Sequence, residues 1–214
     1  MEILTTIIEF FNNGGHFMYP IALVLALAIA ISIERFIFLS KALRDNRRFW
    51  ARVWPLLNAG KMSEAEDLIA NSKFAVAHIM SCGFEQVRID SRRSDVEIAT
   101  EDGLMALLPA IERRTHYLAT FSNAATLLGL LGTVLGLIGA FGALGNADPV
   151  EKANLLSAGI SEAMSCTAFG LMVAIPSLFA HAYLQSQAGE LVDTLESACS
   201  RFVTVISRSK SLQH

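Results

Sequence analysis

Charged residues are scarce in this sequence and are missing from long stretches of it. Asp, Glu, Lys and Arg make up 17% of the 214 residues, and none of them occurs between Thr115 and Ala147. The net charge is only −3, and no basic stripe is interleaved with aromatic residues, so we expect no nucleic-acid partner. Hydrophobic residues make up 53% of the chain, a composition typical of a membrane protein.

The sequence also lacks the spaced side chains that most catalytic and metal sites need. Its three cysteines, Cys82, Cys166 and Cys199, form no CxxC pair, so neither a disulfide framework nor a zinc site is predicted. The histidines are scattered, and no Walker loop, nucleophile elbow, HExxH motif or dinucleotide fingerprint occurs. We therefore expect neither an enzyme nor a bound cofactor.

Three uncharged stretches are long enough to cross a bilayer, whose apolar core needs about 20 helical residues. They cover residues 10–33, 115–147 and 163–189. No strand pattern competes with helix in the rest of the chain. The predicted fold class is an all-α membrane protein with three transmembrane helices, two of which extend into a cytoplasmic helical bundle.

The distribution of Lys and Arg predicts the orientation in the membrane. Of the 17 such residues, only Lys152 lies between the second and third spans, and the first 33 residues contain none. Because positive charge is retained on the cytoplasmic side, we expect a periplasmic N-terminus and a cytoplasmic C-terminus in the bacterial inner membrane. Without a positive leading region, the first stretch is an uncleaved anchor and not a signal peptide.

The same patterns predict the limits of each segment. Capping boxes beginning at Ser63 and Ser94 predict helix starts in the cytoplasmic region. We expect the helix from Ser94 to continue unbroken to Ala143, bent at Pro109. The predicted segments are a periplasmic N-terminal arm (1–15), transmembrane helices (16–39, 118–143 and 159–185), a cytoplasmic helical domain (40–117), a periplasmic loop (144–158) and a cytoplasmic C-terminal helix (186–214).

Small residues recur on one face of the second span and on one face of the third, and each set includes a single threonine. Because the two helices run antiparallel, both hydroxyls should lie at a similar depth, roughly 12–13 Å from the outer surface. Plain helix packing, with each threonine bonded to its own i−4 carbonyl, is the alternative to a lined pathway. The residues are Gly129, Gly132, Thr133, Gly136 and Ala140 in the second span, and Ala163, Thr167, Gly170 and Ala174 in the third.

Carboxylates are nearly absent from the spans. Glu162 lies near the outer end of the third span, about 140° around the helix from Thr167, so it flanks the small-residue stripe and does not join it. Exposure at the interface is an alternative to a functional role for it. No span carries a carboxylate at mid-membrane, which a proton or sodium pathway usually requires. If this chain conducts ions, another subunit must supply that group.

Two sequence runs carry a resemblance to a known family. LATFSNAATLLGLLGTVLGLIGAF and GISEAMSCTAFGLMVAIPSLFAHAY, together with the IERFIFL exit of the first span, resemble the ExbB/TolQ branch of the MotA/TolQ/ExbB proton channel family. The resemblance implies that Thr133 and Thr167 line the proton pathway, that Glu162 lines the outer vestibule, and that Pro176 kinks the third span.

The resemblance also implies an assembly. Such a chain is the large subunit of an inner-membrane motor driven by the proton gradient, a homopentamer around an ExbD- or TolR-like single-span subunit whose aspartate carries the proton. Its output is TonB-dependent transport or a related process, delivered through a TonB- or TolA-like protein. Two alternatives stay open: a scaffold that stabilises the single-span subunit without conducting ions, and a sodium-coupled motor.

Overall fold

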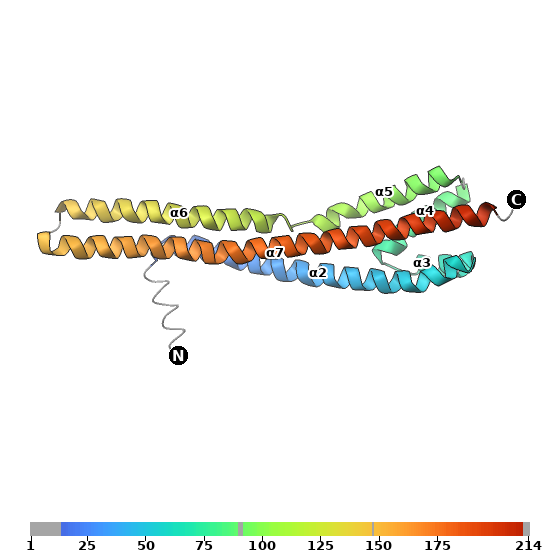
Figure 1. The fold of residues 1–214 in the computed structure, drawn as a ribbon, viewed down its shortest axis with the longest axis horizontal. Helices are drawn as coiled ribbons and strands as arrows, with labels where there is room; N and C mark the ends of the chain where they lie inside the picture. The colour runs from blue at the N-terminus through green and yellow to red at the C-terminus, as the bar shows by residue number, and fades with distance from the viewer. Residues whose placement is uncertain (1–13, 90–91, 147, 212–214) are drawn as a thin grey trace, which may run out of the picture. The chain divides into compact units, whose positions relative to one another are not determined.

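The computed structural model describes residues 14–89, 92–146 and 148–211, and every regular element in these ranges is a helix (Figure 1). Three of the helical segments are long and apolar enough to cross a membrane. The predicted fold class, an all-α membrane protein, is therefore confirmed.

The chain divides into two compact units. The first unit comprises Met1–Glu34 and Arg114–Tyr183, and the second comprises Arg35–Arg113 and Leu184–His214. Two long helices contribute to both units, and α6 belongs to the first unit alone. The elements are α2 (Met18–Asn58), α3 (Met62–Ala70), α4 (Ala75–Ile89), α5 (Arg93–Glu112), α6 (Tyr117–Ala143), the short 3-10 helix η1 (Leu144–Asn146) and α7 (Pro149–Ser211).

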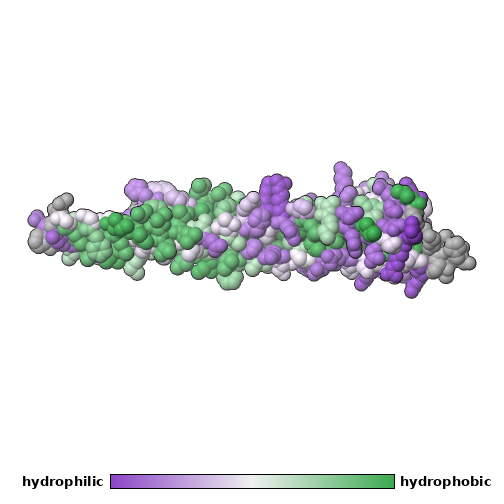
Figure 2. Space-filling view, turned by 90° about the horizontal axis from the view of Figure 1, so that it is seen from above, coloured by the Kyte–Doolittle hydropathy of each residue, from purple (hydrophilic) through white to green (hydrophobic). Residues whose placement is uncertain are grey.

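The first unit packs small and apolar residues inward and large apolar residues outward. Its core cluster contains Ile21 of α2, Ala125 of α6 and Cys166 of α7. Outside this core, Leu127 and Phe179 are 64% and 73% exposed. Figure 2 shows hydrophobic side chains gathered over the part of the chain that forms this unit. An apolar exterior is what a helix surrounded by lipid requires.

The second unit has a conventional apolar core and a polar exterior. Phe202 of α7 is fully buried and meets Phe84 of α4 edge to face, with ring centroids 5.0 Å apart. The buried Asn46 of α2 accepts a hydrogen bond from the Val76 amide at 2.9 Å, which fixes the start of α4. Figure 2 shows hydrophilic side chains interspersed over this part of the chain.

Neither predicted capping box forms. α3 begins at Met62 and α5 at Arg93, so Ser63 and Ser94 lie inside the first turns, and neither N-cap residue makes a side-chain cap hydrogen bond. Glu66, the acid of the first predicted box, pairs with Arg88 of α4 instead. A cross-helix ion pair has thus replaced the local contact that the sequence pattern favoured.

The predicted continuous helix from Ser94 to Ala143 is also wrong. α5 ends at Glu112 and α6 begins at Tyr117, and between them Arg114 has a φ of 67°, a value that non-glycine residues rarely adopt. Pro109 lies inside α5, so the interruption comes after it. Arg35 is 3% exposed, and its guanidinium donates to the carbonyls of Ala110 and Ile111, satisfying acceptors that a helix end leaves open.

The connection between α6 and α7 is shorter than the predicted loop at 144–158. α7 begins at Pro149, a residue suited to a first helical position because its missing N–H has no intrahelical partner there. α6 begins one residue before the predicted second span and ends with it at Ala143. The N-terminal arm predicted at 1–15 lies almost wholly outside the described residues. The membrane boundaries themselves stay predictions.

Candidate functional site

The backbones of α6 and α7 come close together at a pair of glycines. A Cβ atom added to Gly170 would lie 2.6 Å from the carbonyl oxygen of Ala125 and 3.1 Å from the Cα of Gly129. The first distance leaves no room for a side chain at Gly170, and a Cβ on Gly129 would itself lie 3.3 Å from the carbonyl oxygen of Cys166, which is a tight contact. Two turns away, a Cβ on Gly136 would contact that of Ala163 at 3.1 Å. The two small-residue stripes therefore face each other along the helix contact.

Most of these small residues are buried by that contact. Within the single chain, they fill the interface between α6 and α7, and three of them, Gly132, Gly136 and Ala140, also line the cavity described below. Their role as a pore wall in an assembly stays a prediction. The buried positions are Gly129, Gly132, Ala140, Ala163, Gly170 and Ala174, and Gly136 is half-buried.

The structure brings the two predicted threonines together. The Oγ1 atoms of Thr133 and Thr167 are in hydrogen-bond contact with each other. Each also reaches the same backbone oxygen, that of Gly129, at 3.0 Å from Thr133 and 2.9 Å from Thr167. Both side chains are half-buried, so the pair lies at the edge of the helix contact.

Counting protons shows what this cluster offers to a ligand. The Gly129 carbonyl has two lone pairs, and one is taken by the helical N–H of Thr133. One hydroxyl can therefore donate to the carbonyl, and the other donates to the first hydroxyl. Both hydroxyl protons are then used inside the chain, and only oxygen lone pairs remain. In this arrangement of protons, the cluster can accept a hydrogen bond from a ligand.

Glu162 is not part of this cluster. It is exposed, and its carboxylate lies against Gly15, whose φ of 72° is strained for any residue with a side chain. Together with His16, Glu162 lines a cavity of about 410 Å³ whose wall includes four glycines of α6 and α7. These glycines are Gly132, Gly136, Gly139 and Gly159. The predicted role of Glu162 in an outer vestibule stays a prediction. The structure shows in addition that Gly15 and His16, from the N-terminal segment, lie next to it.

Two features of the contact were not predicted. The buried hydroxyl of Ser122 donates to the carbonyl of Ala174 at 2.8 Å, which ties α6 to α7. Ser122 lies seven residues before Gly129, so its helical phase was a usable signal. Cys166 fills the space opposite Gly132. Pro176 is exposed within a continuous α7, and the predicted kink stays a prediction.

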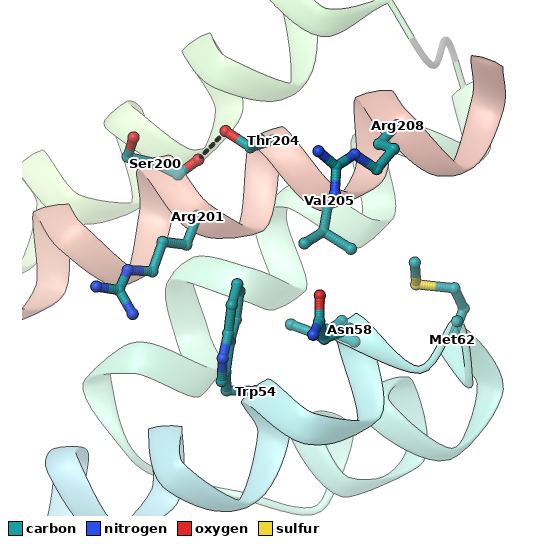
Figure 3. A pocket seen from close by; sticks show the side chains of 10 residues that line it. Trp54, Asn58, Met62, Ser200, Arg201, Thr204, Val205 and Arg208 are labelled. Atoms are coloured by element: carbon teal, nitrogen blue, oxygen red, sulfur yellow. Dashed lines mark hydrogen bonds between the residues drawn. The ribbon is translucent and has the colours of Figure 1, made fainter. Parts of the chain in front are cut away.

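A second cavity, of about 540 Å³, lies in the second unit (Figure 3). The guanidinium of Arg201 stands 5.6 Å from the ring centre of Trp54, and the Thr204 hydroxyl donates to its own helix at the Ser200 carbonyl. No carboxylate or imidazole lines this cavity. Within the described residues, no group of His, Cys, Asp and Glu is arranged to hold a metal ion.

Comparison with known proteins places these features in a family context. Residues 71–197 match the model of the MotA/TolQ/ExbB proton channel family, a range that contains both threonines and Glu162. The chain is 28% identical to the Tol-Pal system protein TolQ of Haemophilus influenzae, over 84% of this chain and 82% of that protein. It is 25% identical to the biopolymer transport protein ExbB of Salmonella typhimurium, over 88% of this chain and 82% of that protein.

A third relative is an ExbB homologue of Methanothermobacter thermautotrophicus, 31% identical over 89% of this chain and 67% of that protein.

Proposed function

The chain belongs to the MotA/TolQ/ExbB proton channel family, and from this premise we propose that it is the large subunit of a proton-driven motor in the bacterial inner membrane. In this proposal it forms a homopentamer around a single-span subunit of the ExbD or TolR type. That subunit supplies the mid-membrane carboxyl group that the three spans of this chain lack.

The threonine pair carries the proposal. Because the protons of Thr133 and Thr167 are used inside the chain, their hydroxyl oxygens offer acceptor lone pairs, which suit a carboxylic acid that donates its O–H. A carboxylate at the same place receives a hydrogen bond only if one hydroxyl gives up its bond inside the chain. Hydrogen bonding to the neutral form raises a carboxyl pKa. The pair therefore favours the protonated state of the partner's carboxyl while it faces this chain.

The motor's output follows from the same proposal. The names of the relatives divide between biopolymer transport and the Tol-Pal system. We place the energised process in this class, with force delivered to the periplasm or outer membrane through a TonB- or TolA-like protein, and with TonB-dependent transport as the favoured member.

Single hydroxyl deletions test the pathway. Thr133→Val and Thr167→Val, made separately, should each abolish gradient-driven proton flux into vesicles containing the chain and its single-span partner. Thr126→Val is the matched control. Thr126 is an exposed threonine of the same helix whose hydroxyl bonds only to the Ser122 carbonyl at 3.0 Å. Full proton flux in both Thr133→Val and Thr167→Val, with normal assembly, would contradict the proposed pathway.

A non-conducting scaffold is the competing function, because the small-residue stripes are filled by packing within the chain. It requires that a partner whose membrane aspartate is changed to asparagine still supports the energised process. A sodium-coupled motor requires flux that follows the external sodium concentration at a fixed proton gradient. Measured proton flux that ignores sodium and stops with the asparagine partner excludes both.

A further inference from the structure

Four exposed cations form a stripe along one face of α2 in the second unit. Lys41, Arg44, Arg48 and Arg52 follow spacings of three, four and four residues, so their side chains fall within about 80° of one helix face. The opposite face is occupied by Leu39, Leu43, Phe49 and Val53, all of which are buried. That packing holds the cationic stripe outward.

The stripe has no intramolecular counter-charge in the part of the chain that the structure describes. Its neighbour Arg47 forms an ion pair with Glu190 at 2.5 Å, but none of the four stripe residues forms one. The single carboxylate between residues 41 and 52 is the half-buried Asp45. The stripe therefore carries an excess positive charge that something outside the chain can neutralise.

An exposed apolar residue next to the stripe indicates which external group neutralises its charge. Ile37 is 60% exposed and lies four residues before Lys41, on the same face of α2. A helix face that changes from exposed isoleucine to exposed lysine within one turn matches the passage from acyl chains to headgroups. The headgroup layer is about 5–8 Å thick on each side of the bilayer core. Lys41 and Arg44 are separated along the helix axis by only about 4.5 Å.

We propose that this stripe binds the headgroups of anionic phospholipids, with Lys41 and Arg44 in the headgroup layer and Arg48 at its edge. The proposal rests on the proposed membrane placement of α2 and requires nothing of the proton pathway. The stripe fixes the depth of α2 in the membrane by charge, where the apolar span alone permits sliding.

The two tryptophans of the chain, Trp50 and Trp54, lie on the same stretch of α2 and report on it directly. The full chain is reconstituted with its partner in nanodiscs of phosphatidylcholine that contain pyrene-labelled phosphatidylglycerol or pyrene-labelled phosphatidylcholine. We expect stronger energy transfer from tryptophan to the anionic label at low salt, and loss of this preference at high salt, because exposed charges are screened. Both leaflets have the same lipids, so the result does not depend on orientation.

The variant Lys41→Gln/Arg44→Gln should reduce the preference for the anionic label by at least about fivefold, the loss expected for even one cation near an anionic surface. The matched control is Lys73→Gln/Arg93→Gln, which removes one lysine and one arginine at exposed sites outside the stripe. An unchanged preference in the stripe variant, or an equal loss in both variants, would overturn the proposal. Thr133→Val protein should keep the preference, so failure of the pathway and failure of the lipid site are separable.

Discussion

At the edge of the α6–α7 contact, the hydroxyls of Thr133 and Thr167 and the carbonyl of Gly129 are joined by hydrogen bonds. Hydrogen bonds between membrane helices contribute only about 0.6 kcal/mol on average. Removing one threonine hydroxyl should therefore leave the fold nearly as stable as before. A large loss of proton flux in the same variant would then report on chemistry and not on unfolding.

Cys199 gives a pH dependence at the scale of one residue. Burial, and then the nearby carboxylates of Glu196 and Glu101, raise its pKa from the ordinary value of 9.0 to about 12. The folded state thus holds the thiol proton more tightly than the unfolded state. The stabilisation is fully present below pH 9 and is lost as the pH rises from 9 towards 12.

Thiol alkylation measures this. In a Cys82→Ser/Cys166→Ala protein, Cys199 should react slowly with maleimide at pH 7–9 and at the rate of a free thiol once the protein is unfolded. The midpoint of unfolding should be constant below pH 9 and fall above it. Equal reaction rates for folded and unfolded protein would contradict the assignment.

Side-chain spacing predicted which residues meet but not what they bond to. Helical phase alone brought Thr133 and Thr167 to one depth, and the structure joins their hydroxyls. The shared acceptor, the Gly129 carbonyl, is a backbone atom that no side-chain pattern reveals. The packing of Glu162 against Gly15 depends on a positive φ and on a contact between distant parts of the chain, and neither leaves a local signature.

Among the helices, the contact between α6 and α7 depends on glycine at one position and not at another. Gly170→Ala should push the helices apart, because its Cβ would lie 2.6 Å from the Ala125 carbonyl. We expect a destabilisation of about 1–3 kcal/mol, typical of overpacking, and weakened contact between the threonines. Thermal unfolding in detergent and proton flux both check this.

Gly139→Ala is the control for that substitution. No atom lies within 4 Å of a Cβ added to Gly139, so the added methyl should be neutral or stabilise the helix by up to about 1 kcal/mol. Equal destabilisation by the two substitutions would show that the close approach at Gly170 is not the cause.

The end of α5 depends on a single arginine of α2. Arg35→Gln should destabilise the second unit by about 2–3 kcal/mol, because it removes charged hydrogen bonds to the buried carbonyls of Ala110 and Ile111. Arg47→Gln is the control, since its ion pair with Glu190 is exposed and worth less than about 1 kcal/mol. Similar melting temperatures for the two variants would argue against a capping role for Arg35.

The limits of the elements show where sequence patterns lose accuracy. The span predicted at 118–143 gave the ends of α6 to within one residue, because apolar length is a local property. The break at 113–116 was missed, because it is stabilised by Arg35, about 75 residues earlier in the chain. The capping pattern also failed at Ser63, where Glu66 pairs with Arg88, and at Ser94, whose hydroxyl donates to the neighbouring Asp95 carboxylate.

At the scale of the whole molecule, the open question for experiment is orientation. Single cysteines are introduced as Asp148→Cys and Lys73→Cys into a protein without its native cysteines; both positions are exposed. An impermeant maleimide should label the cysteine at position 148 in intact cells and the one at 73 only after lysis, because the segment between the first and second spans, which contains Lys73, carries most of the Lys and Arg residues. Labelling in the opposite order would reverse the proposed topology.

The shared acceptor between the two threonines has a consequence for how this protein varies. The Gly129 carbonyl is present whatever amino acid stands at position 129, so no codon change can delete it. Natural variants and saturation libraries alter the hydroxyls around it or the space that leads to it. A genetic survey will therefore identify the side chains around this carbonyl and will not detect the carbonyl itself. Only a change to the main chain itself, such as an ester link after Gly129, weakens that oxygen directly.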